Sequence, residues 1–183
     1  MKRLFDLVSS LIGLVLLFPV FIITAVLIKK DGGSAFYLQD RVGLNGKTFK
    51  LYKFRSMVAN ADKIGGYSTQ VGDPRITKIG KFIRRTSIDE LPQLLNVLKG
   101  DMSVVGPRPN VPQQVKEYTA EDWQLRNSVK PGITGLAQVM YRSSATMQQR
   151  LELDLDYAKR SNLILDIKLV LLTVKQVIVK GGY

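Results

Sequence analysis

Two adjacent carboxylates, Asp89 and Glu90, lie in a stretch of the sequence that is flanked by fixed cations. Arg84 and Arg85 precede the pair, and Arg108 follows it between two prolines. Guanidinium groups bind phosphate through paired N–H donors, while a carboxylate can act as a nucleophile or as a magnesium ligand. The residue types and their order therefore predict a site for a phosphorylated substrate.

The spacing around the pair predicts a helix that begins at Ser87. Ser87 and Glu90 have the spacing of a capping box, and leucines then recur at helical period, at positions 91, 94, 95 and 98. The dyad would lie in the first turn, where orphan N–H groups and the helix dipole favour anions. Acidic residues are also ordinary capping residues there, with no further function. Because neighbouring helical side chains point about 100° apart, we expect one carboxylate to do the chemistry while the other orients it or holds a metal.

Composition limits the chemistry further. With 183 residues, 45% of them hydrophobic, the chain is long enough for one cored domain with an appendage. Its formal charge of +12 implies an anionic partner, which nucleic acid, acidic lipid or a polyphosphate substrate would each satisfy. The sequence contains no cysteine and no histidine. Disulfides, Cys or His metal sites and histidine acid–base chemistry are therefore excluded.

The appendage is an apolar run over residues 4–28, long enough to cross a bilayer core. The run ends in Lys29 and Lys30 without a small-residue cleavage site, so we expect it to remain attached. Lys2 and Arg3 precede it, so the positive-inside rule favours sending neither end outward. Pro19 would kink the helix. The pattern fits two forms equally well, a re-entrant hairpin and a kinked spanning helix.

The segments between the appendage and the C-terminus have simpler patterns. Residues 35–39 and 48–55 are aromatic and alternating, and Gly43 to Gly46 supply a turn, so a β-hairpin is predicted. Residues 58–79 are predicted to form a loop that can cover a site. The glycines at 132 and 135 suggest a tight turn at which backbone N–H groups meet an anion.

Two helices are predicted at the C-terminus, over residues 147–159 and 163–179. The second is strongly apolar but short and charged for a spanning helix, so we expect it to lie at the membrane interface, with a core position as the alternative. Asp166 on this helix is expected to have a basic partner.

Several ordered motifs support a more specific interpretation. They are Lys53-Phe54-Arg55-Ser56-Met57, Ser87-Ile88-Asp89-Glu90-Leu91-Pro92-Gln93, Asn96-Val97-Leu98-Lys99-Gly100-Asp101-Met102-Ser103, Val105-Gly106-Pro107-Arg108-Pro109 and Lys130-Pro131-Gly132-Ile133-Thr134-Gly135. Together they resemble the bacterial sugar transferase family, the monotopic phosphoglycosyl transferases, over nearly the whole chain. Its members transfer a sugar-1-phosphate from a UDP-sugar to a polyprenol phosphate such as undecaprenyl phosphate and release UMP. They use Mg²⁺ and an aspartyl-phosphosugar intermediate.

The resemblance implies a fold and a location. The fold is α+β, mainly helical and membrane-associated, with residues 1–30 as a re-entrant membrane helix broken at Pro19. Residues 31–183 form one catalytic domain with interfacial C-terminal helices. The protein is expected at the cytoplasmic face of the bacterial inner membrane.

The resemblance also assigns roles to individual residues. Asp89 is implied as the nucleophile and as a magnesium ligand, and Glu90 as its partner. The basic residues near the substrate phosphates fall on Lys53, Arg84, Arg108 and Arg142. A carboxylate needs no histidine base, because it is ionised at neutral pH.

The sequence departs from the family pattern at two positions, and two other functions compete with this interpretation. Phe18 precedes Pro19 where the family often has serine, and Lys130 stands where arginine is commoner, which weakens any paired phosphate contact there. A membrane-anchored nucleic-acid-binding module or an acidic-lipid-binding scaffold would explain the charge and the aromatic hairpin. Neither rival explains why cations gather around an Asp-Glu pair, so we expect no nucleic-acid partner.

Overall fold

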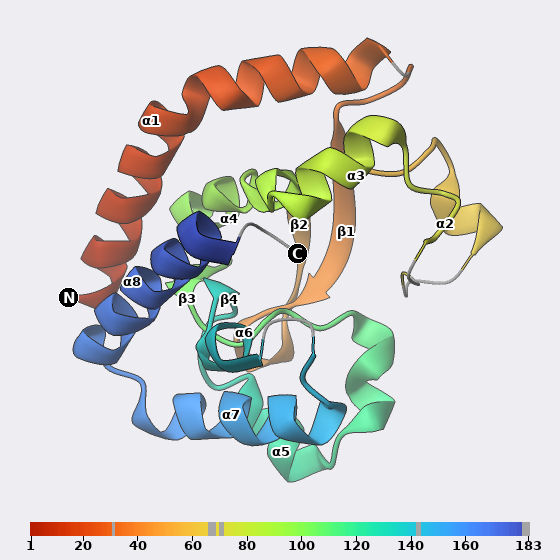
Figure 1. Cartoon of the computed structure of the whole chain (residues 1–183). Coiled ribbons are helices and arrows are strands. Elements are labelled where there is room, and N and C mark those ends of the chain that lie inside the picture. The colour runs from red at the N-terminus through yellow and green to blue at the C-terminus, as the bar shows by residue number, and fades with distance from the viewer. Residues whose placement is uncertain (31, 66–68, 70–71, 142–143, 181–183) are drawn as a thin grey trace.

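The computed structural model describes residues 1–30, 32–65, 69, 72–141 and 144–180. Figure 1 shows a long helix arching over one side of a domain that is built mainly from shorter helices around a β-hairpin. The elements in chain order are α1 (Lys2–Lys30), β1 (Phe36–Val42), η1 (Leu44–Gly46), β2 (Thr48–Phe54), α2 (Ala61–Ile64), α3 (Lys78–Arg85), η2 (Ile88–Glu90), α4 (Gln93–Lys99), β3 (Ser103–Val105), η3 (Pro112–Glu117), α5 (Ala120–Arg126), β4 (Gly132–Thr134), α6 (Leu136–Tyr141), α7 (Met147–Arg160) and α8 (Leu163–Lys180).

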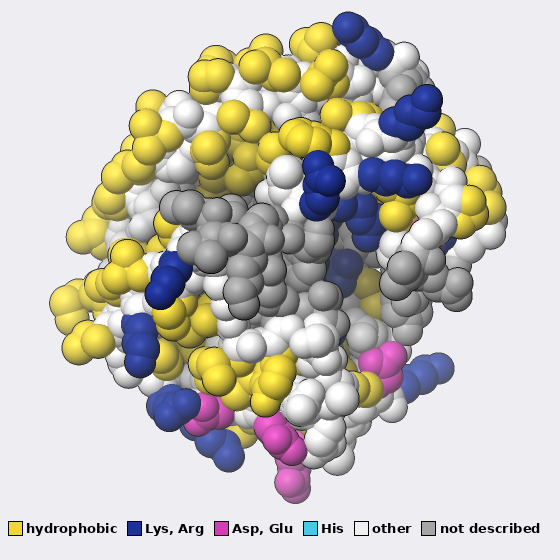
Figure 2. Space-filling model, in the orientation of Figure 1, with side chains coloured by type: hydrophobic (Ala, Val, Ile, Leu, Met, Phe, Trp, Pro, Cys, Tyr) yellow, Lys and Arg dark blue, Asp and Glu magenta, His cyan; other side chains and the backbone are white. Residues whose placement is uncertain are grey.

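Helix α1 presents an apolar surface to the outside. It is long and apolar enough to cross a membrane, Pro19 lies inside it, and it bends along its length (Figure 1). Hydrophobic side chains cover its outer face (Figure 2), and Val15, Leu16 and Phe18 are among those that are exposed. So large an exposed apolar surface is typical of a membrane contact. The predicted membrane helix is thus present, while its re-entrant path stays a prediction.

Polar groups at the start of α1 hold the helix on the domain. The Asp6 carboxylate accepts hydrogen bonds from the Ser103 hydroxyl at 2.8 Å and from the Val104 N–H at 2.9 Å. The Lys2 ammonium lies 2.5 Å from the Asp166 carboxylate, which also accepts a 2.6 Å hydrogen bond from the Tyr157 hydroxyl. We call Lys2, Asp6, Tyr157 and Asp166 the N-terminal cluster. The predicted basic partner of Asp166 is confirmed, and it is Lys2.

The predicted hairpin is confirmed. Strands β1 and β2 pair antiparallel, with Tyr37 opposite Lys53, and the turn η1 joins them. Helix α4 supports the hairpin, because the Asn96 amide accepts a hydrogen bond from the Tyr52 N–H and donates one to the Lys50 carbonyl. Below it, Leu51, Val97 and Met102 pack as one buried cluster.

The glycines at 132 and 135 do not form the predicted anion-binding turn. Residues 132–134 are strand β4, which pairs parallel with β3. The Gly132 N–H is used in a 3.0 Å hydrogen bond to the Pro107 carbonyl. A Cβ atom at Gly132 would lie 2.0 Å from the Gly106 nitrogen. Glycine is therefore needed here because two backbone segments approach closely.

The two C-terminal helices are confirmed, and α8 has two apolar faces. Leu169 and Asp166 are buried against the domain, whereas Ile164, Leu171 and Val174 are exposed. One face of α8 thus packs on the core, as the alternative predicts, while the opposite face remains apolar and exposed. The position of that face at the membrane interface stays a prediction.

Candidate active site

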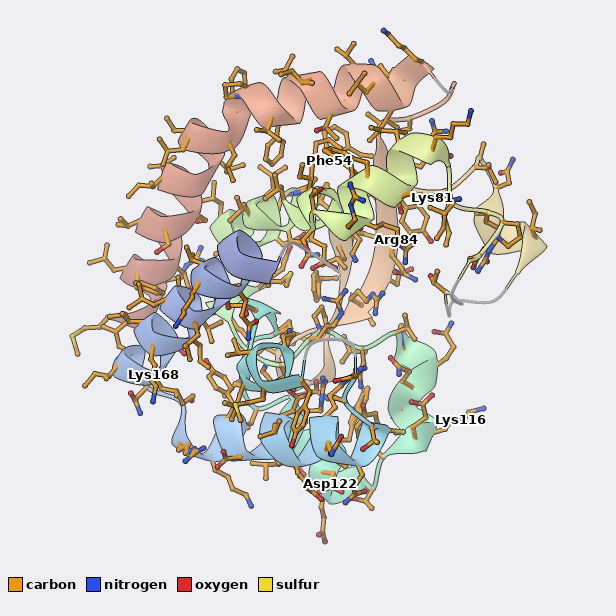
Figure 3. All side chains as sticks on the ribbon, viewed as in Figure 1. Phe54, Lys81, Arg84, Lys116, Asp122 and Lys168 are labelled. Atoms are coloured by element: carbon orange, nitrogen blue, oxygen red, sulfur yellow. The ribbon has the colours of Figure 1, made fainter. Side chains whose placement is uncertain are left out.

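Four of the sequence-predicted residues line one cleft of about 560 Å³: Lys53, Arg84, Asp89 and Arg108. The cleft lies between the hairpin, the end of α3 and the segment that follows β2. Figure 2 shows it as a hollow with Lys and Arg side chains at its edge, and Figure 3 shows Arg84 beside the hairpin. Glu90 joins the group through Lys53 and Arg108. Arg142 lies outside the described residues, and Pro19 lies in α1, apart from this group.

The dyad is not in the first turn of an α-helix, so the capping-box prediction is wrong. Ser87 has a left-handed backbone with φ of 57°, and its side chain makes no capping hydrogen bond. Asp89 and Glu90 lie in the short 3₁₀ turn η2, and α4 begins only at Gln93. The physical reason is Pro92. Proline has no N–H to donate to the carbonyl four residues earlier, so an α-helix starting at Ser87 would be interrupted in its first turns.

Glu90 is held by two cations. Its carboxylate accepts hydrogen bonds from the Lys53 ammonium at 2.8 Å and from two nitrogens of the Arg108 guanidinium at 2.5 and 3.2 Å. Burial by itself would raise the pKa of Glu90, but the charges and hydrogen bonds of Arg108 and Lys53 outweigh burial and hold this pKa well below its usual range. Glu90 is therefore a permanent anion that fixes two cations at the edge of the cleft.

Asp89 has the opposite environment. The residue is 8% exposed, and within the part of the chain that the structure describes its carboxylate makes no hydrogen bond or ion pair. Burial raises the pKa of Asp89 to about 6, and Glu90 acts in the same direction, while the cations Lys53, Arg84 and Arg108 partly offset both. A buried carboxylate in a cleft with a pKa raised in this way is a candidate functional residue.

Neighbouring side chains fix the backbone that carries Arg108. The Arg126 guanidinium donates a 2.7 Å hydrogen bond to the Arg108 carbonyl and forms a buried ion pair with Asp154. The Arg41 guanidinium donates a 2.9 Å hydrogen bond to the Pro109 carbonyl. Both contacts tie the loop after β3 to the rest of the domain, so the Arg108 side chain starts from a rigid base.

Arg41 was missed by the sequence reasoning, although a signal for it was present. Tyr37, Gln39 and Arg41 alternate along β1, and all three line the cleft. Side chains two positions apart in a strand share a face. Because Tyr37 pairs with Lys53, a predicted cleft residue, the alternation alone would have placed Arg41 on the same face.

The residues fit a magnesium ion that is bound together with substrate phosphates. Within the described residues, no three Asp or Glu side chains gather to form a complete protein site. Glu90 is occupied by Lys53 and Arg108, so Asp89 is the carboxylate in the cleft with open oxygens. One or two carboxylates plus substrate phosphates are a common Mg²⁺ ligand set.

Comparison with known proteins identifies relatives along the whole chain. The family model described as bacterial sugar transferase matches residues 1–180. Galactosyl transferase CpsE of Streptococcus agalactiae is 45% identical over 99% of the chain, and sugar transferase EpsL of Bacillus subtilis is 44% identical over all of it. UDP-glucose:undecaprenyl-phosphate glucose-1-phosphate transferase of Escherichia coli is also 44% identical over the full chain.

The relatives differ in length. The chain spans 43% of the S. agalactiae protein and 41% of the E. coli protein, but 89% of the B. subtilis protein. The match extends over the whole chain, from α1 through the cleft to α8, at identities at which the fold is shared. The chain therefore belongs to the bacterial sugar transferase family.

Proposed function

We propose that this protein transfers a sugar-1-phosphate from a UDP-sugar to a polyprenol phosphate, with Asp89 as the covalent nucleophile. The observation that carries the proposal is the contrast inside the dyad. Glu90 is saturated by Lys53 and Arg108, whereas Asp89 lines the cleft with its carboxylate open. The names of relatives support the substrate classes, since the E. coli relative is named for UDP-glucose and undecaprenyl phosphate.

In the first step, an Asp89 oxygen attacks the phosphorus that carries the sugar. An oxygen–phosphorus bond forms, the bond from this phosphorus to the bridging oxygen breaks, and UMP leaves with the bonding electrons. In the second step, an oxygen of the polyprenol phosphate attacks the same phosphorus. The acyl phosphate bond then breaks, and Asp89 regains its carboxylate. Neither step requires a histidine, since both nucleophiles are anions.

The cations supply the charge neutralisation that such a transfer requires. Lys53 and Arg108 are fixed by Glu90, and Arg84 lines the same cleft. Preorganised cations of this kind lower the barrier, because they need not reorient as charge develops on the phosphoryl oxygens. Asp89 is the residue that would hold Mg²⁺ together with the donor phosphates, and the ion would supply further charge neutralisation for the leaving group.

The lipid acceptor fits the apolar surface of the fold. Helix α1 exposes hydrophobic side chains along its length, and α8 exposes Ile164, Leu171 and Val174. We propose that these surfaces sit in the cytoplasmic leaflet and that α1 bends at Pro19 and returns to the side it entered. The cleft then opens at the membrane surface, where a soluble donor and a lipid phosphate can meet.

The comparisons do not identify the sugar of the donor substrate. The relatives are named for glucose, galactose and N-acetylgalactosamine at similar identities. A panel of UDP-sugars, offered with polyprenol phosphate and Mg²⁺, should therefore identify the donor by UMP release. Release of UMP with none of these sugars would contradict the proposed donor class.

The covalent step is tested by trapping. Incubation with the accepted donor, without acceptor, should give a protein adduct whose added mass is that of the sugar phosphate. Peptide mapping should place it on Asp89, and Asp89→Asn should not form it. Asp40→Asn is the matched control, because Asp40 is an exposed carboxylate on the hairpin, paired with Lys50, and should leave the adduct unchanged. An adduct on any other residue would reject the assignment.

The path of α1 is tested by cysteine labelling, which the cysteine-free sequence makes simple. One cysteine is added before Met1 and another is introduced as Lys30→Cys. A re-entrant helix predicts that both react only from the cytoplasmic side. Reaction of the N-terminal cysteine from the outside alone would instead identify a spanning helix.

A further inference from the structure

Arg41 is a cation in the cleft whose hydrogen bonds are left incomplete within the described part of the chain. A guanidinium has five N–H donors. Arg41 uses one nitrogen for the Pro109 carbonyl, at 2.9 Å, and another for the Gln39 side-chain oxygen, at 2.7 Å. Its third nitrogen, Nε, is buried and has no hydrogen-bond partner among the residues that the structure describes. Both partners are neutral, and no carboxylate among the described residues forms an ion pair with Arg41.

The surroundings of Arg41 disfavour its charge, so an anion there would be stabilised. Burial lowers the pKa of Arg41 to about 10, the nearby Arg108 charge adds to this effect, and Glu90 opposes it. The side chain thus stays charged at neutral pH, beside a second cation. A buried cation without a counterion is costly, whereas the same cation facing a cleft is a binding site for an anionic substrate.

The position of Arg41 along β1 indicates which anion this side chain binds. The first end of the hairpin packs against the membrane helix, because Phe36 stacks on Phe54 and Phe54 contacts Phe21 of α1. At the other end, the Val42 N–H binds the Asn110 carbonyl. Figure 1 shows β1 running away from α1. The backbone of Arg41 lies four residues beyond Tyr37, which is about 13 Å farther along the strand.

We propose that Arg41 binds the phosphoryl group that leaves with UMP, on the side of the cleft farthest from the membrane. The inference rests on the proposed function and deepens it, since it separates the phosphate sites of the two substrates. The lipid phosphate must approach from the α1 side, so its site lies toward Lys53 and Arg84. The leaving nucleotide is soluble, and Arg41 can hold it where it departs into water.

The test measures binding of UMP and of a short, water-soluble polyprenol phosphate to the intact protein. Arg41→Gln should weaken UMP binding about tenfold or more, the loss expected for a charge-assisted hydrogen bond, and leave the lipid phosphate within about twofold. Arg41→Lys keeps the charge and should recover part of the UMP affinity. Arg85→Gln is the matched control, because Arg85 is exposed and is not among the residues that line the cleft.

Two results would overturn the inference. One is unchanged UMP affinity in Arg41→Gln, and the other is a loss confined to the lipid phosphate. Equal loss of both ligands, with no recovery in Arg41→Lys, would also reject it, because the residue would then only support the fold. Direct binding of UMP does not depend on turnover. A failed UDP-sugar panel would therefore remove the proposed function, while this measurement decides the role of Arg41 separately.

Discussion

The dyad and the N-terminal cluster both bury carboxylates beside cations, but they differ in how completely those carboxylates are satisfied. In the N-terminal cluster, Asp166 is fully buried and accepts from Lys2 and Tyr157, and Asp6 accepts from Ser103 and Val104. In the dyad, Glu90 is equally saturated, yet Asp89 is left open to a cleft. Native proteins pair nearly all their buried polar groups. An unsaturated carboxylate therefore indicates function, and a saturated one indicates structure.

The largest expected effect is on the open carboxylate. Asp89→Asn should reduce sugar-phosphate transfer by at least about a thousandfold, because the amide cannot form the acyl phosphate bond. Asp89→Asn should also leave the free energy of unfolding unchanged or increase it. The folded pKa of Asp89 lies above its ordinary value of 3.8, so above pH 6 the carboxylate is ionised in both states and its charge disfavours folding. The gain should be at most about 3 kcal/mol. UMP release and urea unfolding measure the two effects.

Two outcomes would contradict the distinction between the open Asp89 carboxylate and the saturated carboxylates. If Asp89→Asn were as active as the parent chain, the open carboxylate would not be the nucleophile. If it unfolded at much lower urea concentration, Asp89 would be a structural residue whose partner had been overlooked.

The saturated cluster should respond in stability instead. Asp166→Ala removes the carboxylate that accepts from both the Lys2 ammonium and the Tyr157 hydroxyl, and leaves them the Val105 carbonyl, at 3.2 and 3.0 Å, as their remaining common acceptor. Burial and the hydrogen bond to Asp166 raise the pKa of Tyr157, so it stays a neutral donor that needs an acceptor. We expect the free energy of unfolding to fall by about 2–4 kcal/mol. This is less than the loss for breaking a fully buried ion pair, because Lys2 is partly exposed.

The measurement is thermal or urea unfolding in detergent. The double change Lys2→Met with Asp166→Leu is the informative control, because it removes the charge together with its partner. It should recover part of the lost stability. A single variant as stable as the parent chain would show that the cluster does not hold α1 on the domain.

The pH dependence sharpens the comparison inside the dyad. Asp89 must be ionised to attack, and its pKa of about 6 means that a tenth of the molecules or fewer are competent at pH 5. The rate of UMP formation in a single turnover without acceptor should therefore fall about tenfold between pH 7 and pH 5. The donor diphosphate keeps its charge over this range, and the pKa of Glu90 is held far below it. A flat profile would contradict the assignment of Asp89.

The sequence predicted those parts of the site that depend on local pattern. The hairpin followed from alternation and a glycine turn, and Lys53, Arg84, Asp89 and Arg108 were grouped correctly because each lies in or beside a recognisable motif. The capping-box spacing of Ser87 and Glu90 predicts the wrong turn around the dyad, because Pro92 has no N–H with which to continue an α-helix from Ser87.

Other features depend on contacts between distant segments, which no local window contains. In the sequence, Arg126 has the pattern of an ordinary cation near the end of a helix. In the structure it is buried, forms an ion pair with Asp154 and donates a hydrogen bond to the Arg108 carbonyl. The glycine at 132 reads as a turn, but it is required by the close approach of Gly106. In both cases the role of the residue is set by a partner from a distant part of the sequence, such as Arg108, 18 positions before Arg126.

The smallest expected effect is on the ion pair that is neither buried nor in the cleft. Lys50 and Asp40 face each other across the hairpin at 2.9 Å, but both side chains are more than half exposed. Water and salt screen such a pair, so Asp40→Asn should change stability by less than about 0.5 kcal/mol and leave UMP release unchanged. The Lys53–Glu90 pair at the dyad has nearly the same distance, 2.8 Å, but its two side chains are only 17% and 13% exposed. If Asp40→Asn lowered the free energy of unfolding as much as Asp166→Ala, the distance between the charges, rather than their burial and hydrogen bonding, would determine how much an ion pair stabilises this protein.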